Sequence, residues 1–467
     1  MTTTAEDSVF SGPGVLAEQV RTGQVHPREL VELCLGRIEA LNGRLNAFRV
    51  TLADEALAAA DAAAQGGGPL AGVPVAIKDD TPVAGQATTH GSRTFGPPAP
   101  ADAEVVRRLR AAGAIPIGIT NVPELTVFPW TASDANGITR NPWDPTRTPG
   151  GSSGGSASAV ASGMVPCATG SDGGGSIRIP ASCCGLVGMK PTRGRVSMQP
   201  AAEHWLGLTT YGPLARTVAD SALLLDVMQG TVAGDIHVTP PPAGSYHEAA
   251  ATPPSRLRIA VSRKVPGGLI APLSADQREA WEGTCSLLSD LGHEVTERHP
   301  AYGMASIEFV RTWLRGIYEE SLTVPDRSKL ERTTRQMAAV GKLISDRRAE
   351  KLRGKRGATA ARILALWEDF DVLLTPGLAS TAIAAEGGYG RSGVVAFNTA
   401  GRFTPWTAIF NLTGQPAITV PAGFSADGLP LSVQLVGRLG AEDTLYSLAG
   451  QIETARPWAD RRPQNAA

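Results

Sequence analysis

The chain lacks any long apolar run: no stretch of about 18 consecutive apolar residues occurs, so no membrane-spanning helix is predicted. The amino terminus, MTTTAEDSVF, also lacks the basic and apolar regions of a secretory signal. Cysteine is scarce, because five scattered residues leave one thiol unpaired and make no disulfide framework. These absences favour a protein of a reducing compartment, the cytoplasm, with no membrane partner.

A surplus of charge is missing too. The 43 basic and 44 acidic side chains give a formal net charge of -1, which provides no general attraction to nucleic acid. With 42% hydrophobic and 19% charged residues, the composition is that of an ordinary globular protein and excludes disorder, a coiled coil or collagen. Glycine (53 residues) and proline (35 residues) are abundant instead, so the places where they cluster carry information.

From residue 65 onward, short apolar runs alternate with segments of helical periodicity, which predicts an α/β fold with a sheet covered by helices on both faces. The predicted strands are 73–77, 115–119, 257–261, 372–375, 417–420 and 431–436. The predicted helices are 104–112, 156–162, 213–230, 274–291 and 442–455.

The pattern differs before residue 65. Residues 14–64 are predicted to be helical, with three helices of which the third covers 52–64, so residues 1–64 form an N-terminal helical segment packed on a main domain of residues 65–467. Residues 240–254 are predicted to be a surface loop. A helical insertion is expected around residues 300–370.

One charge run lies in that insertion. Residues 327–356 contain 11 Lys or Arg against 3 Asp or Glu, which fits either an anion-binding or nucleic-acid patch or a solvated helical hairpin. The hairpin is favoured, since such runs are usually solvent faces. Its core-facing residues are predicted to be Leu330, Met337, Val340, Leu343 and Ile344.

Lys78 ends the apolar run in GVPVAIKDD, where a charged side chain is unusual. In the ordinary case such a lysine pairs with Asp79 or Asp80 and extends to water. In the alternative case it enters the interior, where burial disfavours its charged form and lowers its pKa. Lys78 is therefore a candidate base.

Two glycine-rich motifs carry serines. In PGGSSGGS, residues 149–156, Ser152 and Ser153 lie between glycine pairs, which permit close backbone approach to a substrate. In SDGGGSIRIP, residues 171–180, three glycines precede Ser176, and successive N–H groups of such a loop converge into an anion-binding nest. Each motif alone is also compatible with a plain glycine turn. A nest beside a hydroxyl is what acyl transfer requires, because the oxyanion of the tetrahedral intermediate needs donors fixed in advance.

A serine nucleophile needs a base. The seven histidines, at positions 26, 90, 204, 237, 247, 293 and 299, share no motif with these serines. A neutral lysine can replace histidine in this role. The residues by themselves therefore indicate a serine hydrolase whose proton acceptor is Lys78.

The two serine motifs, within NPWDPTRTPGGSSGGSASAVASG and SDGGGSIRIPASCCGLVGMKPTRGRVS, resemble the amidase signature family. Similar stretches are GVPVAIKDD, TNVPEL, GPLARTVAD and FNLTGQPAITVPAGF, so the resemblance covers roughly residues 65–440. Members are serine hydrolases that cleave amides through a Ser-cisSer-Lys triad. The resemblance implies a large mixed, twisted sheet and an amidase acting on a small molecule without metal or other cofactor.

Position by position, the resemblance implies three catalytic residues. Lys78 matches the base, Ser152 the bridging serine on a cis peptide, and Ser176 the serine that accepts the acyl group. Ser153 is the second choice for the bridge. The implied relay passes the proton of Ser176 through Ser152 to neutral Lys78, which requires the three side chains to be in contact.

The resemblance also assigns the loop around the nucleophile. Asp172 and Arg178 match an acid and an arginine that are expected to brace it. Many family members have threonine or a larger aliphatic residue where Gly173 stands, so this loop is predicted to be more mobile. Cys183 and Cys184 are expected to be packing residues rather than nucleophiles. The implied oxyanion donors are the backbone N–H groups among Gly173, Gly174, Gly175 and Ser176.

Two other functions fit parts of the chain. Residues 151–155 satisfy the G-x-S-x-G pattern of α/β-hydrolase esterases, but residues 141–149 are too polar for the buried strand that this motif follows, and no histidine occurs after His299.

The second is the A subunit of tRNA-dependent amidotransferases, which resembles the same family. The near-neutral charge favours a free-standing hydrolase, monomeric or homodimeric, that binds no nucleic acid. Zinc spacings and Walker loops do not occur, so no cofactor is expected.

The substrate is predicted only by class. Binding pockets are mostly apolar and aromatic with a few polar groups. An aryl or medium-sized amide is expected, and esters and aryl carbamates (urethanes) present a similar carbonyl group. The candidate pocket residues are Phe128, Trp130, Trp205, Tyr211, Trp406 and Phe410.

Overall fold

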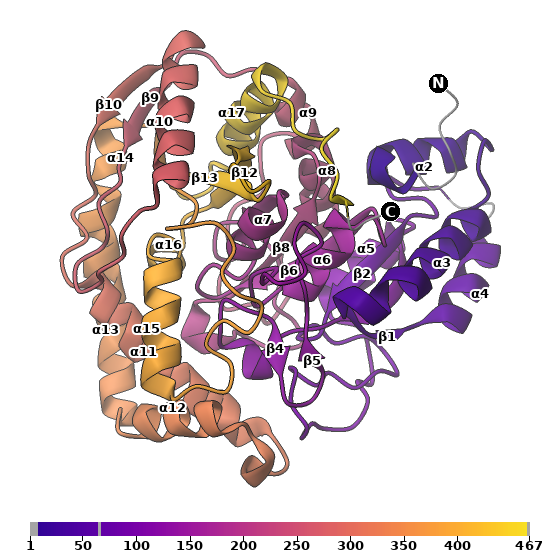
Figure 1. The fold of residues 1–467 in the computed structure, drawn as a ribbon, viewed down its shortest axis with the longest axis horizontal. Coiled ribbons are helices and arrows are strands. Elements are labelled where there is room, and N and C mark those ends of the chain that lie inside the picture. The colour runs from indigo at the N-terminus through magenta and orange to yellow at the C-terminus, as the bar shows by residue number, and fades with distance from the viewer. Residues whose placement is uncertain (1–7, 64–66, 465–467) are drawn as a thin grey trace.

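The computed structural model describes residues 8–63 and 67–464. Its centre is an 11-stranded sheet in the order β1-β3-β2-β6-β8-β7-β12-β13-β11-β9-β10, with a separate two-stranded sheet β4-β5 (Figure 1). The strands are β1 (Phe48–Thr51), β2 (Pro74–Lys78), β3 (Ile115–Thr120), β4 (Ala132–Ser133), β5 (Gly137–Ile138), β6 (Cys167–Asp172), β7 (Val187–Lys190), β8 (Thr210–Ala215), β9 (Arg258–Val261), β10 (Glu294–Glu297), β11 (Val372–Pro376), β12 (Ala417–Phe424) and β13 (Pro430–Val436).

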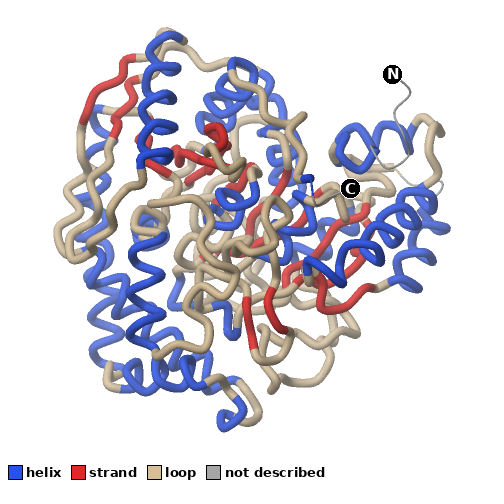
Figure 2. Tube along the Cα trace, viewed as in Figure 1, coloured by secondary structure: helices blue, strands red, loops and turns tan. Residues whose placement is uncertain are grey.

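Helices surround this sheet, as the blue and red segments of Figure 2 show. The α-helices are α2 (Pro13–Arg21), α3 (Pro27–Leu45), α4 (Ala53–Ala63), α5 (Glu104–Ala111), α6 (Gly154–Ala161), α7 (Arg178–Cys184), α8 (Val218–Met228), α9 (Tyr246–Ala251), α10 (Ala275–Asp290), α11 (Ala305–Thr323), α12 (Arg332–Lys342), α13 (Asp346–Leu364), α14 (Leu366–Asp369), α15 (Gly393–Phe403), α16 (Ile409–Thr413) and α17 (Glu442–Ala455). The 3-10 turns are η1 (Val9–Ser11), η2 (Glu124–Thr126), η3 (Trp205–Gly207) and η4 (Arg327–Lys329).

The sheet is mixed and buried on both faces. Strands β2, β3 and β6 are parallel to one another, whereas β6, β8, β7, β12 and β13 pair antiparallel. Alternation along β11 sends Val372 and Leu374 into a core beneath α5, α8, α10 and α17, and Leu373 into the opposite core beneath α11, α13 and α16. The predicted α/β fold with a large mixed sheet covered on both faces is therefore confirmed.

The prediction of three helices in residues 14–64 missed a strand. Helices α2, α3 and α4 are present, but β1 lies between α3 and α4 and pairs antiparallel with β3, Phe48 opposite Thr120. A strand of four residues is too short to show a period of its own, and only its partner β3 makes it a strand. The N-terminal segment thus extends the main sheet, and the predicted boundary after residue 64 lies outside the described residues.

Two further boundaries differ from the prediction. Residues 213–215 belong to β8 rather than to a helix, because α8 begins only at Val218, where the Thr217 side chain accepts a hydrogen bond from the Asp220 N–H at 3.1 Å. The predicted surface loop 240–254 contains α9, which Ser245 caps and which buries Tyr246 against Tyr446. In both places a hydroxyl cap sets the first turn.

The basic run forms η4, α12 and the first part of α13, so it is helical as predicted, but α12 and α13 each pack on α11 rather than on one another, and the predicted hairpin is wrong. The predicted buried face also differs in detail. Leu330 and Met337 are buried, whereas Val340 is 48% and Leu343 75% exposed, and Ile344 is half-buried. Helix α12 ends at Lys342, so Leu343 lies in the turn and points away from the core. The predicted inward positions of Val340 and Leu343 are therefore wrong.

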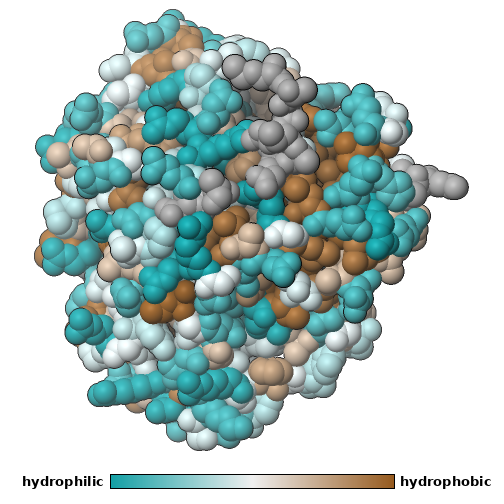
Figure 3. Space-filling model, turned by 45° about the vertical axis from the view of Figure 1, so that its right-hand side comes forward, coloured by the Kyte–Doolittle hydropathy of each residue, from teal (hydrophilic) through white to brown (hydrophobic). Residues whose placement is uncertain are grey.

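The described helices include none that is both long and apolar enough to cross a bilayer. On the face drawn in Figure 3, hydrophilic residues cover most of the surface, and apolar residues form separate patches between them.

Candidate active site

Lys78 is the last residue of β2, a strand that is buried along its whole length between β3 and β6. Its side chain is 0% exposed, so it does not extend to water. Its ion-pair partner is Asp80, at 3.1 Å, whereas Asp79 pairs with Arg49. The interior position predicted as the alternative for this lysine is the one observed.

Three groups surround the Lys78 amine. It donates to the Ser152 hydroxyl at 2.8 Å and to the Ser171 hydroxyl at 2.6 Å, and the Ser171 hydroxyl in turn donates to Asp80. Burial lowers the pKa of Lys78 from its ordinary value of 10.5, although the negative charge of Asp80 opposes this shift. The site therefore favours a lysine that gives up its proton more readily than one in water.

The first serine motif forms a tight bend before helix α6. The peptide bond between Gly151 and Ser152 is cis, as the resemblance implied. A Cβ atom on Gly151 would lie 2.6 Å from the Phe128 carbonyl oxygen, so only glycine fits there. Ser152 is 1% exposed and directs its hydroxyl to Lys78.

Ser153, the second choice for the bridge, lies elsewhere. Its hydroxyl donates to the Ser171 carbonyl oxygen at 3.4 Å, and its backbone N–H donates to the Ser176 carbonyl oxygen at 3.2 Å. Ser153 thus ties the two serine loops together, while Ser152 is the serine in contact with Lys78.

The second serine motif connects β6 to α7. Gly173, Gly174 and Ser176 are partly exposed and line a pocket together with Ser152. No described residue makes a hydrogen bond to the Ser176 hydroxyl, so the expected contact between Ser152 and Ser176 is not a hydrogen bond here. A Cβ atom on Gly173 would lie 2.8 Å from the Thr209 hydroxyl, so a larger residue here would require the Thr209 side chain to move.

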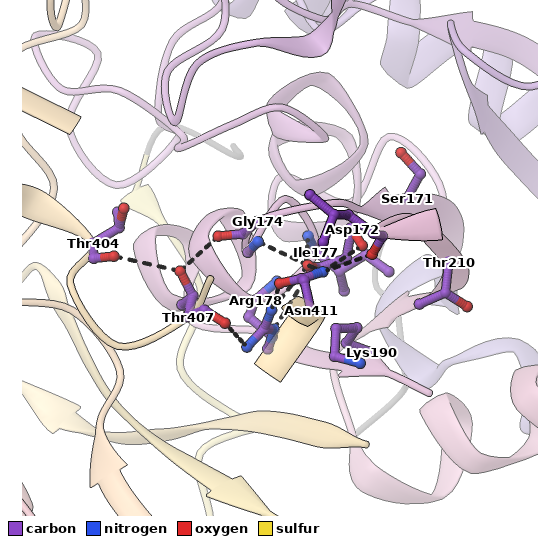
Figure 4. Close-up of polar contacts among 12 residues, drawn as sticks. Ser171, Asp172, Gly174, Ile177, Arg178, Lys190, Thr210, Thr404, Thr407 and Asn411 are labelled. Carbon is purple, nitrogen blue, oxygen red and sulfur yellow. Dashed lines mark hydrogen bonds and ion pairs between the residues drawn. The ribbon is translucent and has the colours of Figure 1, made fainter. Parts of the chain in front are cut away.

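A buried ion pair holds this loop (Figure 4). Arg178 contacts both carboxylate oxygens of Asp172 at 2.9 Å, and both side chains are 0% exposed. Asp172 also accepts the Gly175 N–H at 2.7 Å, and the Asn411 amide donates to it at 2.8 Å. Burial alone would raise the pKa of Asp172, but the charge and hydrogen bonds of Arg178 outweigh it and hold this pKa well below its ordinary value. This network supports the bracing role expected for both residues and adds Asn411 to it.

The pocket encloses about 1170 Å³, including its solvent-open mouth, and Ser152 and Ser176 lie in its wall. Three of the six predicted aromatic residues line it: Phe128, Trp205 and Tyr211. The other three are wrong as pocket residues. Trp130 stacks behind Phe128 at 4.7 Å, and Trp406 and Phe410 are core residues that are 1% and 0% exposed.

Other aromatic residues take their place. Trp313 lies at the centre, with ring centroids 6.2 Å from Phe128, 6.0 Å from Trp205 and 6.0 Å from Phe397. Trp313 comes from α11 and Phe397 from α15, far along the chain from the serine motifs. No signal near the motifs could have identified them.

The pocket also contains titratable groups that the sequence did not single out: Asp80, His90, His204 and Glu320. The His204 ring lies 3.7 Å from Glu320. Burial lowers and Glu320 raises the pKa of His204, with a net upward shift, while His204 outweighs burial to lower the pKa of Glu320. His90 and His204 are 114 residues apart in the sequence, so the sequence could not show that they line the same pocket.

Other chemistry has little support at this site. Cys183 and Cys184 are buried, and burial raises the pKa of both thiols, as expected for packing residues. Within residues 8–63 and 67–464, no group of three or more His, Cys, Asp or Glu side chains could hold a metal ion.

The chain resembles known proteins over most of its length. A model of the Amidase family matches residues 29–446. The chain is 48% identical over 464 residues to the Mycobacterium tuberculosis protein named "Putative amidase AmiB2", covering 98% of both chains. The solved structure of 6-aminohexanoate cyclic dimer hydrolase complexed with substrate has a TM-score of 0.90 at 33% identity and covers 98% of this chain and 100% of that one. A bacterial aryl acylamidase of the amidase signature family has a TM-score of 0.84 at 26% identity, covering 96% of each chain. The chain therefore belongs to the amidase family, in its amidase signature group.

Proposed function

We propose that the protein hydrolyses carboxylic amides through an acyl-enzyme on Ser176, with Ser152 and Lys78 as the proton relay. The contact that supports this assignment most strongly is the 2.8 Å hydrogen bond between the buried Lys78 amine and the Ser152 hydroxyl, beside a pocket that Ser176 also lines. A buried amine with a lowered pKa is suited to accept a proton.

In this mechanism Ser176 attacks the substrate carbonyl while its proton moves to Ser152 and from there to neutral Lys78. Because the Ser152 and Ser176 hydroxyls are not hydrogen-bonded to each other without substrate, the approach of the carbonyl completes the relay. Backbone N–H groups among Gly173, Gly174 and Ser176 stabilise the oxyanion. The predicted donor Gly175 is not one of them, because its N–H already donates to Asp172 at 2.7 Å. The amine leaves with the proton returned through Ser152, and water then hydrolyses the acyl-enzyme.

The aromatic group around Trp313 favours an aryl or medium-sized apolar amide. Esters and aryl carbamates are expected as side substrates, because they present the same carbonyl to the same nucleophile.

The five unpaired cysteines fit a cytoplasmic location. The alternative function is the A subunit of a tRNA-dependent amidotransferase, which requires partner subunits. An assay of amide turnover by the purified chain alone distinguishes the two, because only the hydrolase should work without partners.

The test is replacement of the nucleophile. Ser176→Ala is expected to abolish anilide hydrolysis and to prevent labelling by a fluorophosphonate, measured by mass spectrometry of the intact protein. Ser289→Ala, an exposed serine on α10, serves as the matched control and should keep both. Labelling of Ser176→Ala at another serine would refute the assignment.

A further inference from the structure

Two carboxylates lie in one part of the pocket. Asp80 follows β2, Glu320 lies on α11, and both line the pocket with side chains that are 10% and 20% exposed. Such partly buried carboxylates keep much of their electrostatic strength, because little water screens them. We call Asp80, Glu320 and Tyr211 the acidic subsite.

The charge balance of this subsite changes in the working enzyme. Three basic side chains lie near it: Lys78 faces Asp80, His204 faces Glu320, and His90 lines the same pocket. The proposed mechanism requires Lys78 to be uncharged, and Asp80 then loses its counterion. His204 remains beside Glu320, so the charge without a counterion is that of Asp80.

Tyr211 provides an independent observation. This residue of β8 is 1% exposed and lines the pocket, and its hydroxyl has no hydrogen-bond partner among the described residues, although Thr81 lies beside it. Burial and the charges of Asp80 and Glu320 raise the pKa of Tyr211, and all three residues line the same pocket. Buried hydroxyls are normally hydrogen-bonded. A Tyr211 hydroxyl without a partner in the pocket wall is therefore available to a polar group of a ligand.

The proposed mechanism puts the subsite on the leaving-amine side of the scissile bond. In the proposed mechanism Ser152 and Lys78 return the proton to the leaving nitrogen, and Asp80 is 3.1 Å from the Lys78 amine.

We propose that the acidic subsite binds a protonated nitrogen carried on the leaving-amine half of the substrate, so that the preferred substrates are amides of diamines. The inference rests on the proposed function, because the neutral state of Lys78 creates the uncompensated charge. The aromatic residues around Trp313 then accommodate the apolar remainder of the molecule.

The test compares two anilides of the same acid, the 4-(aminomethyl)anilide and the 4-ethylanilide, which have equal size and differ in one ammonium group. A hydrogen bond to a charged group contributes about 1.5–3 kcal/mol, so kcat/KM for the cationic anilide should be roughly ten- to a hundredfold higher. The same ammonium placed on the acyl half should give no such preference.

In Glu320→Gln, the ratio of kcat/KM for the cationic anilide to kcat/KM for the 4-ethylanilide should fall toward one. Glu319→Gln is the matched control, because Glu319 is the neighbouring residue, 38% exposed and paired with Arg315, and it should keep the preference. A wild-type ratio of one or less, an unchanged ratio in Glu320→Gln, or a preference for the ammonium on the acyl half would each overturn the proposal.

A binding measurement separates this inference from the proposed function. Calorimetry with Ser176→Ala should give a Kd about tenfold or more lower for the cationic than for the neutral anilide, whether or not the wild type turns them over. Equal Kd values would refute the subsite, whereas retained turnover by Ser176→Ala would refute the nucleophile and leave the subsite intact.

Discussion

Replacing Arg178 by methionine tests the ion pair that holds the nucleophile loop. Arg178 and Asp172 are both 0% exposed, so solvent neither screens the pair nor hydrates the carboxylate left behind. Removing one partner of a buried pair costs about 3–5 kcal/mol. The remaining donors to Asp172, which include the Gly175 N–H and the Asn411 amide, soften this loss without supplying a positive charge. We expect Arg178→Met to lower the free energy of unfolding by about 3–5 kcal/mol.

The assay is equilibrium unfolding in urea, with Arg258→Met as the matched control. Arg258 forms an equally short ion pair with Asp371, at 2.9 Å, but is 45% exposed, and exposed pairs contribute about 0–1 kcal/mol. A loss in Arg178→Met no larger than in the control would refute the reasoning.

The same variant should change the acid dependence of stability. The pKa of Asp172 in the folded protein lies well below its ordinary value of 3.8, so the stabilisation by the pair is fully present above that pH and is lost as pH falls toward the lowered pKa. In Arg178→Met this loss should shrink, because the unpaired carboxylate no longer has its pKa held down.

Two further predictions concern the base and the pocket. Because Lys78 acts without its proton and burial lowers its pKa from 10.5, kcat/KM should rise with pH to a plateau, with a midpoint below 10.5. Lys78→Met should remove that rise, and a rate profile of the same shape in this variant would contradict the role of the lysine. Trp313→Ala should raise KM for an anilide roughly tenfold and leave a small aliphatic amide nearly unaffected, because it removes ring contacts worth about 0.5–1.5 kcal/mol each. Equal effects on both substrates would show that Trp313 supports the fold rather than the aromatic subsite.

The sequence alone predicted the α/β class and most long elements, because buried strands and amphipathic helices carry their own periodicity. It missed β1, whose four residues become a strand only by pairing with β3. It also extended a helix back to residue 213, because the apolar residues of β8 continue the spacing of α8. Where local pattern and pairing partner disagree, the partner decides.

For the proposed site, the sequence singled out residues that lie in short motifs: Lys78, Ser152, Ser176 and the loop between Asp172 and Arg178. It could not identify groups that distant elements bring to the same pocket. Trp313 and Glu320 come from α11, and His204 precedes η3, with no shared motif to link them to the serines. Only the tertiary structure decided which of Asp79 and Asp80 meets Lys78, because neighbouring side chains after a strand point in different directions. The motif residues could be found from their sequence neighbours alone. The lining of the pocket and its charge could not, because they depend on how the sheet and helices bring together segments far apart in the chain.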